Sequence, residues 1–148
     1  MFDNAVSKKT GLVLKKLVEN GLTKDFYMAG GTAAALYLGH RISRDVDLFT
    51  VKEFDNSVVI SRLRKLGKFR LESESWGAVW CMLDEAKVSL FVYDYPLLKP
   101  PAGYNGVKLA SLLDIACMKI SAISSRGARR DFIDLYIKRL CCLCAIYL

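Results

Sequence analysis

The feature that most constrains the fold is a glycine pair followed at short range by two aspartates. Gly30-Gly31 lies between an apolar segment (26–29) and an alanine-rich segment (33–38), and thirteen residues separate Gly31 from Asp45-Val46-Asp47. An apolar run, two glycines and strong helix formers predict a strand, a tight turn and a helix. Residues i and i+2 of a strand point to one face, so the two aspartates share a face.

Each half of this pattern has a chemical use. Glycines at a strand-to-helix turn let a ligand approach the backbone, and the following helix offers free N–H groups to a phosphate. Two carboxylates on one strand face can hold a Mg²⁺ ion or a pair of ions. A glycine pair alone is usually a turn, and such aspartates alone are commonly a solvated edge. The combination predicts a site for metal and phosphate.

The rest of the chain predicts an α+β fold, with a mixed sheet flanked by helices and a helical C-terminal part. A length of 148 residues favours one compact domain. We expect an α/β core over 1–95, a Pro/Gly-rich connecting loop over 96–106, and a helical part over 107–148 that packs on the core. The expected helices are 7–22, 33–38, 55–67, 111–124 and one from about 128; the expected strands are 26–29, 45–49, 68–73, 76–83 and 87–93.

Composition narrows the partners and the compartment. The formal net charge of +7 suits polyanions such as nucleotides or nucleic acid. The longest uncharged stretches fall short of the ~20 apolar residues of a membrane span, so we expect no membrane partner. Five cysteines, three of them crowded into 141–144, fit neither a disulfide framework nor a zinc site. Reduced cysteines in a cytoplasmic protein are the expectation.

A glycine pair, a short helix and an Asp-hydrophobic-Asp strand resemble the signature of the polymerase-β nucleotidyltransferase superfamily. The wider segments 29–36 and 39–49 resemble the AbiEii/AbiGii toxin nucleotidyltransferases within it. Segment 112–123 is similar to that family's lysine-containing helix, and 126–136 to its Arg/Lys-Asp-x-x-Asp-Leu motif. The resemblance runs from about Phe26 to Tyr136.

The resemblance implies a role for each matching residue. By this resemblance, the phosphate-cradling turn is Gly30, Gly31 and Thr32, and the metal-binding pair is Asp45 and Asp47. Lys119 corresponds to a triphosphate contact. Asp131 corresponds to the final acid of the motif, and Asp134 follows it. Three further residues suit phosphate contacts or holding the loop: Arg41, Ser43 and Arg126. Taken alone, Lys119 is typical of a solvated helix residue and Asp131 of an acid paired with a nearby arginine.

The resemblance also implies a function. It is Mg²⁺-dependent (or Mn²⁺-dependent) transfer of a nucleotide from an NTP to an acceptor. The implied acceptor is RNA such as tRNA, and the implied protein is the toxin of a bacterial toxin–antitoxin or phage-defence pair, with a cognate antitoxin as partner. The sequence does not select the base, the acceptor or the oligomeric state.

The sequence departs from the family pattern at two places, which leaves alternative functions open. Ser89 occupies the strand position where the superfamily commonly has a third carboxylate, and a hydroxyl binds Mg²⁺ poorly. The chain ends in an apolar segment, 140–148, where the family usually continues. One alternative is a catalytically degenerate nucleotide-binding module; another is a transferase acting on a small molecule or a protein. We expect His40 not to act as a base, and Trp76, Trp80 and segment 91–93 to serve sheet packing.

Overall fold

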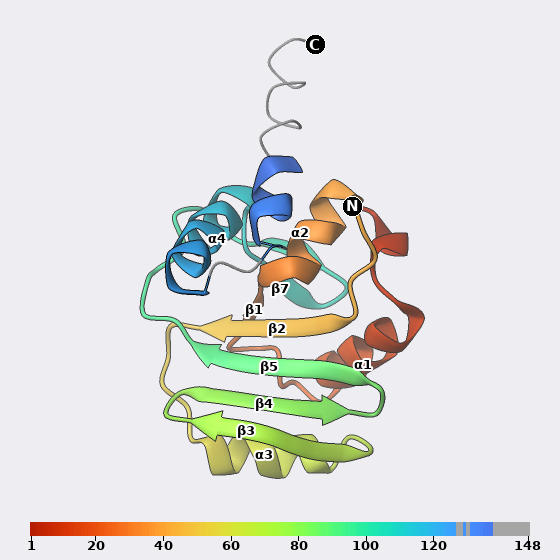
Figure 1. The fold of residues 1–148 in the computed structure, drawn as a ribbon. Helices are drawn as coiled ribbons and strands as arrows, with labels where there is room; N and C mark the ends of the chain where they lie inside the picture. Colours follow the sequence, from red (N-terminus) through yellow and green to blue (C-terminus); the bar gives the residue numbers. More distant parts are fainter. Residues whose placement is uncertain (127–128, 130, 138–148) are drawn as a thin grey trace.

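The computed structural model describes residues 1–126, 129 and 131–137, which form a mixed sheet with helices on both sides (Figure 1). Seven strands of this part follow the order β3-β4-β5-β2-β1-β7-β6. The helices are a 3-10 turn (Asp3–Ala5), α1 (Lys8–Glu19), α2 (Gly30–Leu38), α3 (Asn56–Arg64) and α4 (Leu112–Arg126). The strands are β1 (Tyr27–Met28), β2 (Asp45–Thr50), β3 (Phe69–Ser75), β4 (Ala78–Leu83), β5 (Ala86–Val92), β6 (Ala102–Tyr104) and β7 (Val107–Leu109). The expected α+β class is confirmed.

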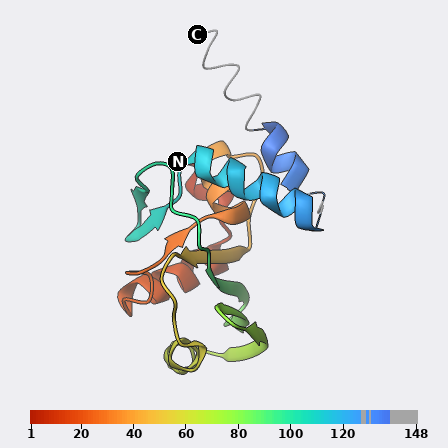
Figure 2. The ribbon, with the colours of Figure 1, turned by 90° about the vertical axis from the view of Figure 1, so that its left-hand side faces the viewer.

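The two faces of the sheet are covered differently. Helices α1 and α3 lie against one side, whereas α4 and the helical segment 131–137 project over the other side at one end (Figure 2). The core lies on the α1 and α3 side, where β2 contributes Val46 and Leu48, both fully buried. On the opposite side, the face of β5, β4 and β3 carries no described helix (Figure 1). This side is called the open face below.

Local signals explain where the helices begin and end. The Ser7 hydroxyl accepts a hydrogen bond from the Thr10 amide at the start of α1, at 3.1 Å. The Asp55 carboxylate accepts from the Ser57 amide at the start of α3, at 2.7 Å. Gly39 adopts a left-handed conformation with φ +62° and ends α2. These are the capping residue types that helix ends favour, so the predicted helices form with boundaries moved by a few residues.

The strand register places side chains from three strands in one row. Strand β2 pairs with β5 in parallel, and Asp47 stands opposite Ser89. Strand β4 pairs with β5 antiparallel, and Trp80 stands opposite Ser89. Because residues in register on neighbouring strands share a face, Asp47, Ser89 and Trp80 all lie on the open face.

The segment expected to be a connecting loop differs from its prediction. Residues 96–106 contain β6, and β7 follows at once, so this hairpin extends the main sheet beside β1. Asn105 and Gly106 form its turn, with φ +45° and +82°. Asn-Gly is a strong sequence signal for a tight hairpin. The prolines at 96, 100 and 101 drew the prediction toward a loop, but all three precede the hairpin.

Two further expectations meet the limits of the described part. The apolar segment 140–148 lies outside the described residues, and the last expected helix is described only at 129 and 131–137, where those residues are helical. None of the helices within the described ranges combines the length and apolar character needed to cross a membrane.

Candidate active site

A cavity of about 420 Å³ lies at the corner between the open face and the overhanging helices. Its walls come from the glycine turn, strands β2, β5 and β4, helix α4, and the helical segment that carries Asp131. Segments more than 80 residues apart in the sequence therefore meet around one space. The predicted residues that line it are Gly30, Gly31, Arg41, Ser43, Asp45, Asp47, Lys119 and Asp131, together with Ser89.

The acidic pair lies against the glycine turn. Asp45 and Asp47 are both half-buried on β2 and share the open face, as their spacing predicts. Gly30 has φ +66°, and a Cβ added there would lie 2.7 Å from Oδ2 of Asp47. Glycine at this position thus provides both the left-handed backbone and the room for the carboxylate. The pleat of β2 and the turn together fix where negative charge sits in the cavity.

Ser89 completes the row beside the acids. It is 3% exposed on β5, in register with Asp47, which is where a third carboxylate was sought. Among the described residues, no group of three or more His, Cys, Asp or Glu is arranged to hold a metal ion. Magnesium usually keeps several waters and is bound through one or two carboxylates plus substrate phosphates. A two-carboxylate set facing an open cavity therefore fits Mg²⁺ held jointly with a phosphorylated substrate.

The guanidinium of Arg41 lies over the start of α2. A Cβ added to Gly31 would lie 2.2 Å from Nη2 of Arg41, so the absence of a side chain admits the cation. Helix starts carry free N–H groups and a partial positive charge. Ser43 and Thr32 lie behind this cation, with their hydroxyl oxygens 2.7 Å apart. Thr32 is 1% exposed and does not line the cavity, so the structure places it in support of the turn.

Lys119 of α4 is held in a buried ion-pair cluster. Its Nζ donates to Oδ1 of Asp131 at 2.6 Å and lies 2.9 Å from Oδ2 of Asp134. The side chain of Lys119 is 8% exposed and those of both aspartates are 1% exposed. The solvated position considered for Lys119 from sequence is wrong, because the helix at 131–137 covers it. Asp131 thus accepts a hydrogen bond from this lysine.

The loop before β2 joins the same cluster through Asp134. His40 Nε2 lies 2.7 Å from Oδ1 of Asp134, and Arg41 donates from Nε and Nη2 to its two oxygens at 3.1 and 3.3 Å. Burial acts to raise the pKa of Asp134. The hydrogen bonds from Arg41, Lys119 and His40 outweigh that effect and hold its pKa below the ordinary value. His40 thus contacts the acid between two cations.

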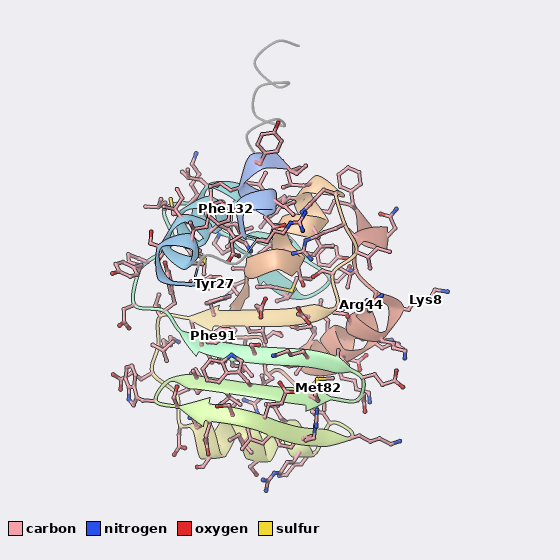
Figure 3. The ribbon with its side chains drawn as sticks, in the orientation of Figure 1. Lys8, Tyr27, Arg44, Met82, Phe91 and Phe132 are labelled. Carbon is pink, nitrogen blue, oxygen red and sulfur yellow. The ribbon has the colours of Figure 1, made fainter. Side chains whose placement is uncertain are left out.

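Aromatic side chains form a part of the cavity that the sequence analysis missed. Phe49, Trp80 and Phe91 line it, and so does Lys87. The Phe91 ring lies 5.1 Å from that of Phe49 and 5.4 Å from that of Trp80, in tilted and edge-on contacts. Figure 3 shows Phe91 on the open face. Trp80 and Phe91 pack against each other on the sheet, as predicted, and also line the cavity, which alternation along β4 and β5 could have indicated.

A second, apolar cavity of about 300 Å³ adjoins the first. The two share Gly30, Phe49, Phe91 and Lys119 as wall residues. The second extends between Tyr93 and the face of α4 that carries Ile115, Met118, Ser121 and Ala122. An acidic and cationic space thus continues into an apolar one. The remaining predicted phosphate contact, Arg126, ends α4, and its side chain lies outside the described part of the structure.

Solved structures with this fold are nucleotidyltransferases. The Megavirus polyadenylate synthase gives TM-score 0.62 and 10% identity over 88% of this chain and 31% of that one. ANT(2'')-Ia, solved in complex with adenylyl-2''-tobramycin, gives TM-score 0.57 and 15% identity over 89% and 88%. JHP933 of Helicobacter pylori gives 0.59 and 18% over 88% and 66%. At these identities the likeness shows the fold.

The family follows from sequence comparison. Residues 12–85, half of the chain, match the family described as "Nucleotidyl transferase AbiEii toxin, Type IV TA system". The chain belongs to this family, as its motifs predicted. The uncharacterized protein aq_aa25 of Aquifex aeolicus (strain VF5) is 42% identical over 135 residues, 88% of this chain and 66% of that protein. The chain thus spans about two thirds of the length of this curated relative.

Proposed function

We propose that this chain transfers a nucleotide from an NTP to an RNA acceptor, with Mg²⁺ or Mn²⁺, as the toxin of a toxin–antitoxin pair. The observation that carries the proposal is one cavity in which two carboxylates lie against a glycine turn with Arg41 and Lys119 beside it. Carboxylates for a divalent ion and cations for a polyphosphate are the two requirements of phosphoryl chemistry. Family membership and fold support the same activity.

Different residues of the cavity bind different parts of the NTP. The start of α2 and the guanidinium of Arg41 hold the β- and γ-phosphates by N–H donation and charge. Asp45 and Asp47 would hold the divalent ion, which would supply charge neutralisation to the phosphates of the NTP. Lys119 offers one cation at the junction of the two cavities, where its two aspartate partners fix its position. The apolar cavity takes the nucleobase, because it adjoins this junction and has aromatic walls.

The transfer step forms one phosphorus–oxygen bond and breaks another. The acceptor hydroxyl oxygen bonds to the α-phosphorus of the NTP, and the bond from that phosphorus to the bridging oxygen of the leaving group breaks. Pyrophosphate leaves toward Arg41 and the α2 start. The hydroxyl proton passes to a carboxylate oxygen of the acidic pair. Since the developing charge is met by groups already held in place, little reorganisation accompanies the reaction.

Charge and family support RNA and an antitoxin as partners. The net charge of +7 favours a polyanionic acceptor over a neutral one. One solved structure of the same fold is a polyadenylate synthase, whose name describes addition of nucleotides to a polynucleotide. The matched family is described as a toxin of a type IV TA system, which supplies the reason for expecting an antitoxin.

One observation favours a second candidate. ANT(2'')-Ia shares the fold over 89% of this chain and was solved with an adenylylated aminoglycoside, so a small molecule is the alternative acceptor class. Ser89 in place of a third carboxylate favours a further candidate, a nucleotide-binding module without transfer activity. Both remain within the same fold and the same nucleotide site.

A labelling experiment separates these functions. The purified chain is incubated with each α-labelled NTP, Mg²⁺ and total tRNA, beside the double variant Asp45→Ala/Asp47→Ala. We expect label on RNA with the unaltered protein alone. Label on a small molecule or on protein selects another acceptor class. If no transfer occurs and calorimetry detects no Mg²⁺-dependent NTP binding, the proposed enzyme activity is contradicted.

A further inference from the structure

The open face of the sheet continues past the acidic pair on the side away from the glycine turn. Trp80 of β4 lies in the same row as Asp47 and Ser89, two strands along from the acid. Neighbouring strands are about 4.8 Å apart, so the indole stands roughly 10 Å from the β2 backbone. Trp80 is half-buried and lines the cavity. It therefore offers an aromatic surface at the border between the cavity and the open face.

A cation lies one row further along. Lys87 of β5 is in register with Asp45, and its side chain is 45% exposed. It lies 3.4 Å from Glu72, which is also 3.4 Å from Arg70. Lys87, Arg70 and Glu72 together carry a net charge of +1, and Asp45 stands in register with Lys87 on the same face. A half-buried aromatic ring beside a partly exposed cation is a combination that single-stranded nucleic-acid sites use.

The donor site determines from which side the acceptor comes. Arg41, Lys119 and the start of α2 gather the triphosphate on one side of the acidic pair. In an in-line displacement the attacking oxygen approaches opposite the leaving pyrophosphate. Opposite to those cations, across Asp45 and Asp47, lie β5 and β4. Within the described residues, this approach carries no helix that would block it (Figures 1 and 2).

We propose that Trp80 and Lys87 form the acceptor subsite: the indole stacks on the last base of a single-stranded RNA end, and the ammonium contacts its phosphate. The inference deepens the proposed function, since it presupposes that an NTP occupies the glycine-turn side. The edge contact with Phe91 at 5.4 Å holds the indole in place. Stacking tolerates every base, so the subsite positions an RNA end without selecting its sequence.

Fluorescence gives a test that needs no catalysis. The chain has two tryptophans, and Trp76 lies 73% exposed in the turn between β3 and β4. Trp76→Phe leaves Trp80 as the sole indole. We expect a hexameric oligoribonucleotide to quench its emission in a saturable, salt-sensitive manner. Quenching by NTP and Mg²⁺ but not by RNA would place the donor base at Trp80 and overturn the proposal; absence of quenching by RNA overturns it too.

Kinetics give the second arm. We expect Trp80→Ala to raise the KM for RNA roughly 10- to 100-fold and to leave the KM for NTP unchanged, with Trp80→Phe restoring most of the loss. Trp76→Ala is the matched control and leaves both unchanged. Lys87→Gln lowers the dependence of RNA affinity on salt by about one ion. An unchanged RNA KM in Trp80→Ala overturns the subsite while transfer itself persists.

The two proposals fail separately. Saturable quenching of Trp80 by RNA in a protein that transfers no nucleotide supports the RNA subsite and contradicts the activity. Transfer of label to RNA with no quenching of Trp80 by RNA supports the activity and contradicts the subsite.

Discussion

The two walls of the cavity are built by different means. On the sheet wall, the alternation of strand β2 places Asp45 and Asp47 on one face, beside the glycine turn. On the helical wall, Asp134 gathers His40, Arg41 and Lys119 from segments up to 94 residues away. The first wall depends on backbone geometry and the second on buried ion pairs. Changes to the first should therefore affect chemistry, and changes to the second should affect stability first.

The largest effect is expected on the sheet wall. Asp45→Asn and Asp47→Asn should each lower nucleotide transfer by about 10³-fold or more, because each removes a charge that holds the divalent ion. Both side chains are half-buried at the cavity, so the thermal midpoint should shift little. Labelled-NTP transfer and calorimetric unfolding measure the two quantities. A large loss of stability in either variant would contradict the division between the walls.

The helical wall should respond in the opposite sense. Asp134→Ala removes the buried acceptor that Lys119, itself buried, shares with the partly exposed Arg41, and should lower the free energy of unfolding by about 3–5 kcal/mol. For a chain of this length that corresponds to a fall of roughly 10 °C in the thermal midpoint. The matched control is Asp25→Asn, whose exposed pair with Lys52 should leave the thermal midpoint unchanged. Equal shifts in the two variants would refute the importance of burial.

Acidic pH should lower the stability of the protein in the same way as the substitution of Asp134. The pKa of Asp134 is lower in the folded chain than its ordinary value. Its stabilising contribution is therefore complete above the unfolded pKa of about 3.9 and is lost as pH falls through the folded pKa. The difference in unfolding free energy between the unaltered protein and Asp134→Asn should shrink as the pH falls below about 4. Urea titrations across this range test it, and a difference that grew in acid would reverse the sign.

An effect on stability smaller than that of Asp134→Ala is expected at the turn that joins the walls. Gly30→Ala forces a side chain into a left-handed conformation, with its Cβ 2.7 Å from the Asp47 carboxylate. We expect a cost of about 1–2 kcal/mol in unfolding free energy and a displaced acid, hence a fall in transfer. Gly103→Ala is the control, because a Cβ there meets nothing within 4 Å. Unchanged transfer in Gly30→Ala would show that the acid does not depend on the turn.

The same contrast explains what the sequence could predict. The acid pair, the glycine turn and Ser89 follow from alternation and turn chemistry, which are local. Register was also within reach: a turn at 84–85 pairs Leu83 with Ala86 and hence Trp80 with Ser89. The prediction that Trp80 serves sheet packing did not use that pairing. The Asn105-Gly106 hairpin was missed although its signal was present.

The helical wall could not be predicted in the same way. The motif placed Lys119, Asp131 and Asp134 on helices, but a helix pattern does not say which faces meet across the fold. Their pairing depends on α4 and the segment 131–137 packing over the sheet, and on His40 reaching a residue 94 positions later. Resemblance to the family supplied the residues, and tertiary packing supplied their partners.

That separation in sequence has a consequence for the order in which the protein becomes competent during synthesis. The ribosome releases the acidic pair and the glycine turn early, whereas Asp134 emerges 94 residues after His40. At about 5–20 residues per second, this interval lasts roughly 5 to 20 s. During it, the loop cations lack the anion that positions them. The nascent chain thus passes through a period in which Asp45 and Asp47 have been synthesised but Asp134 has not.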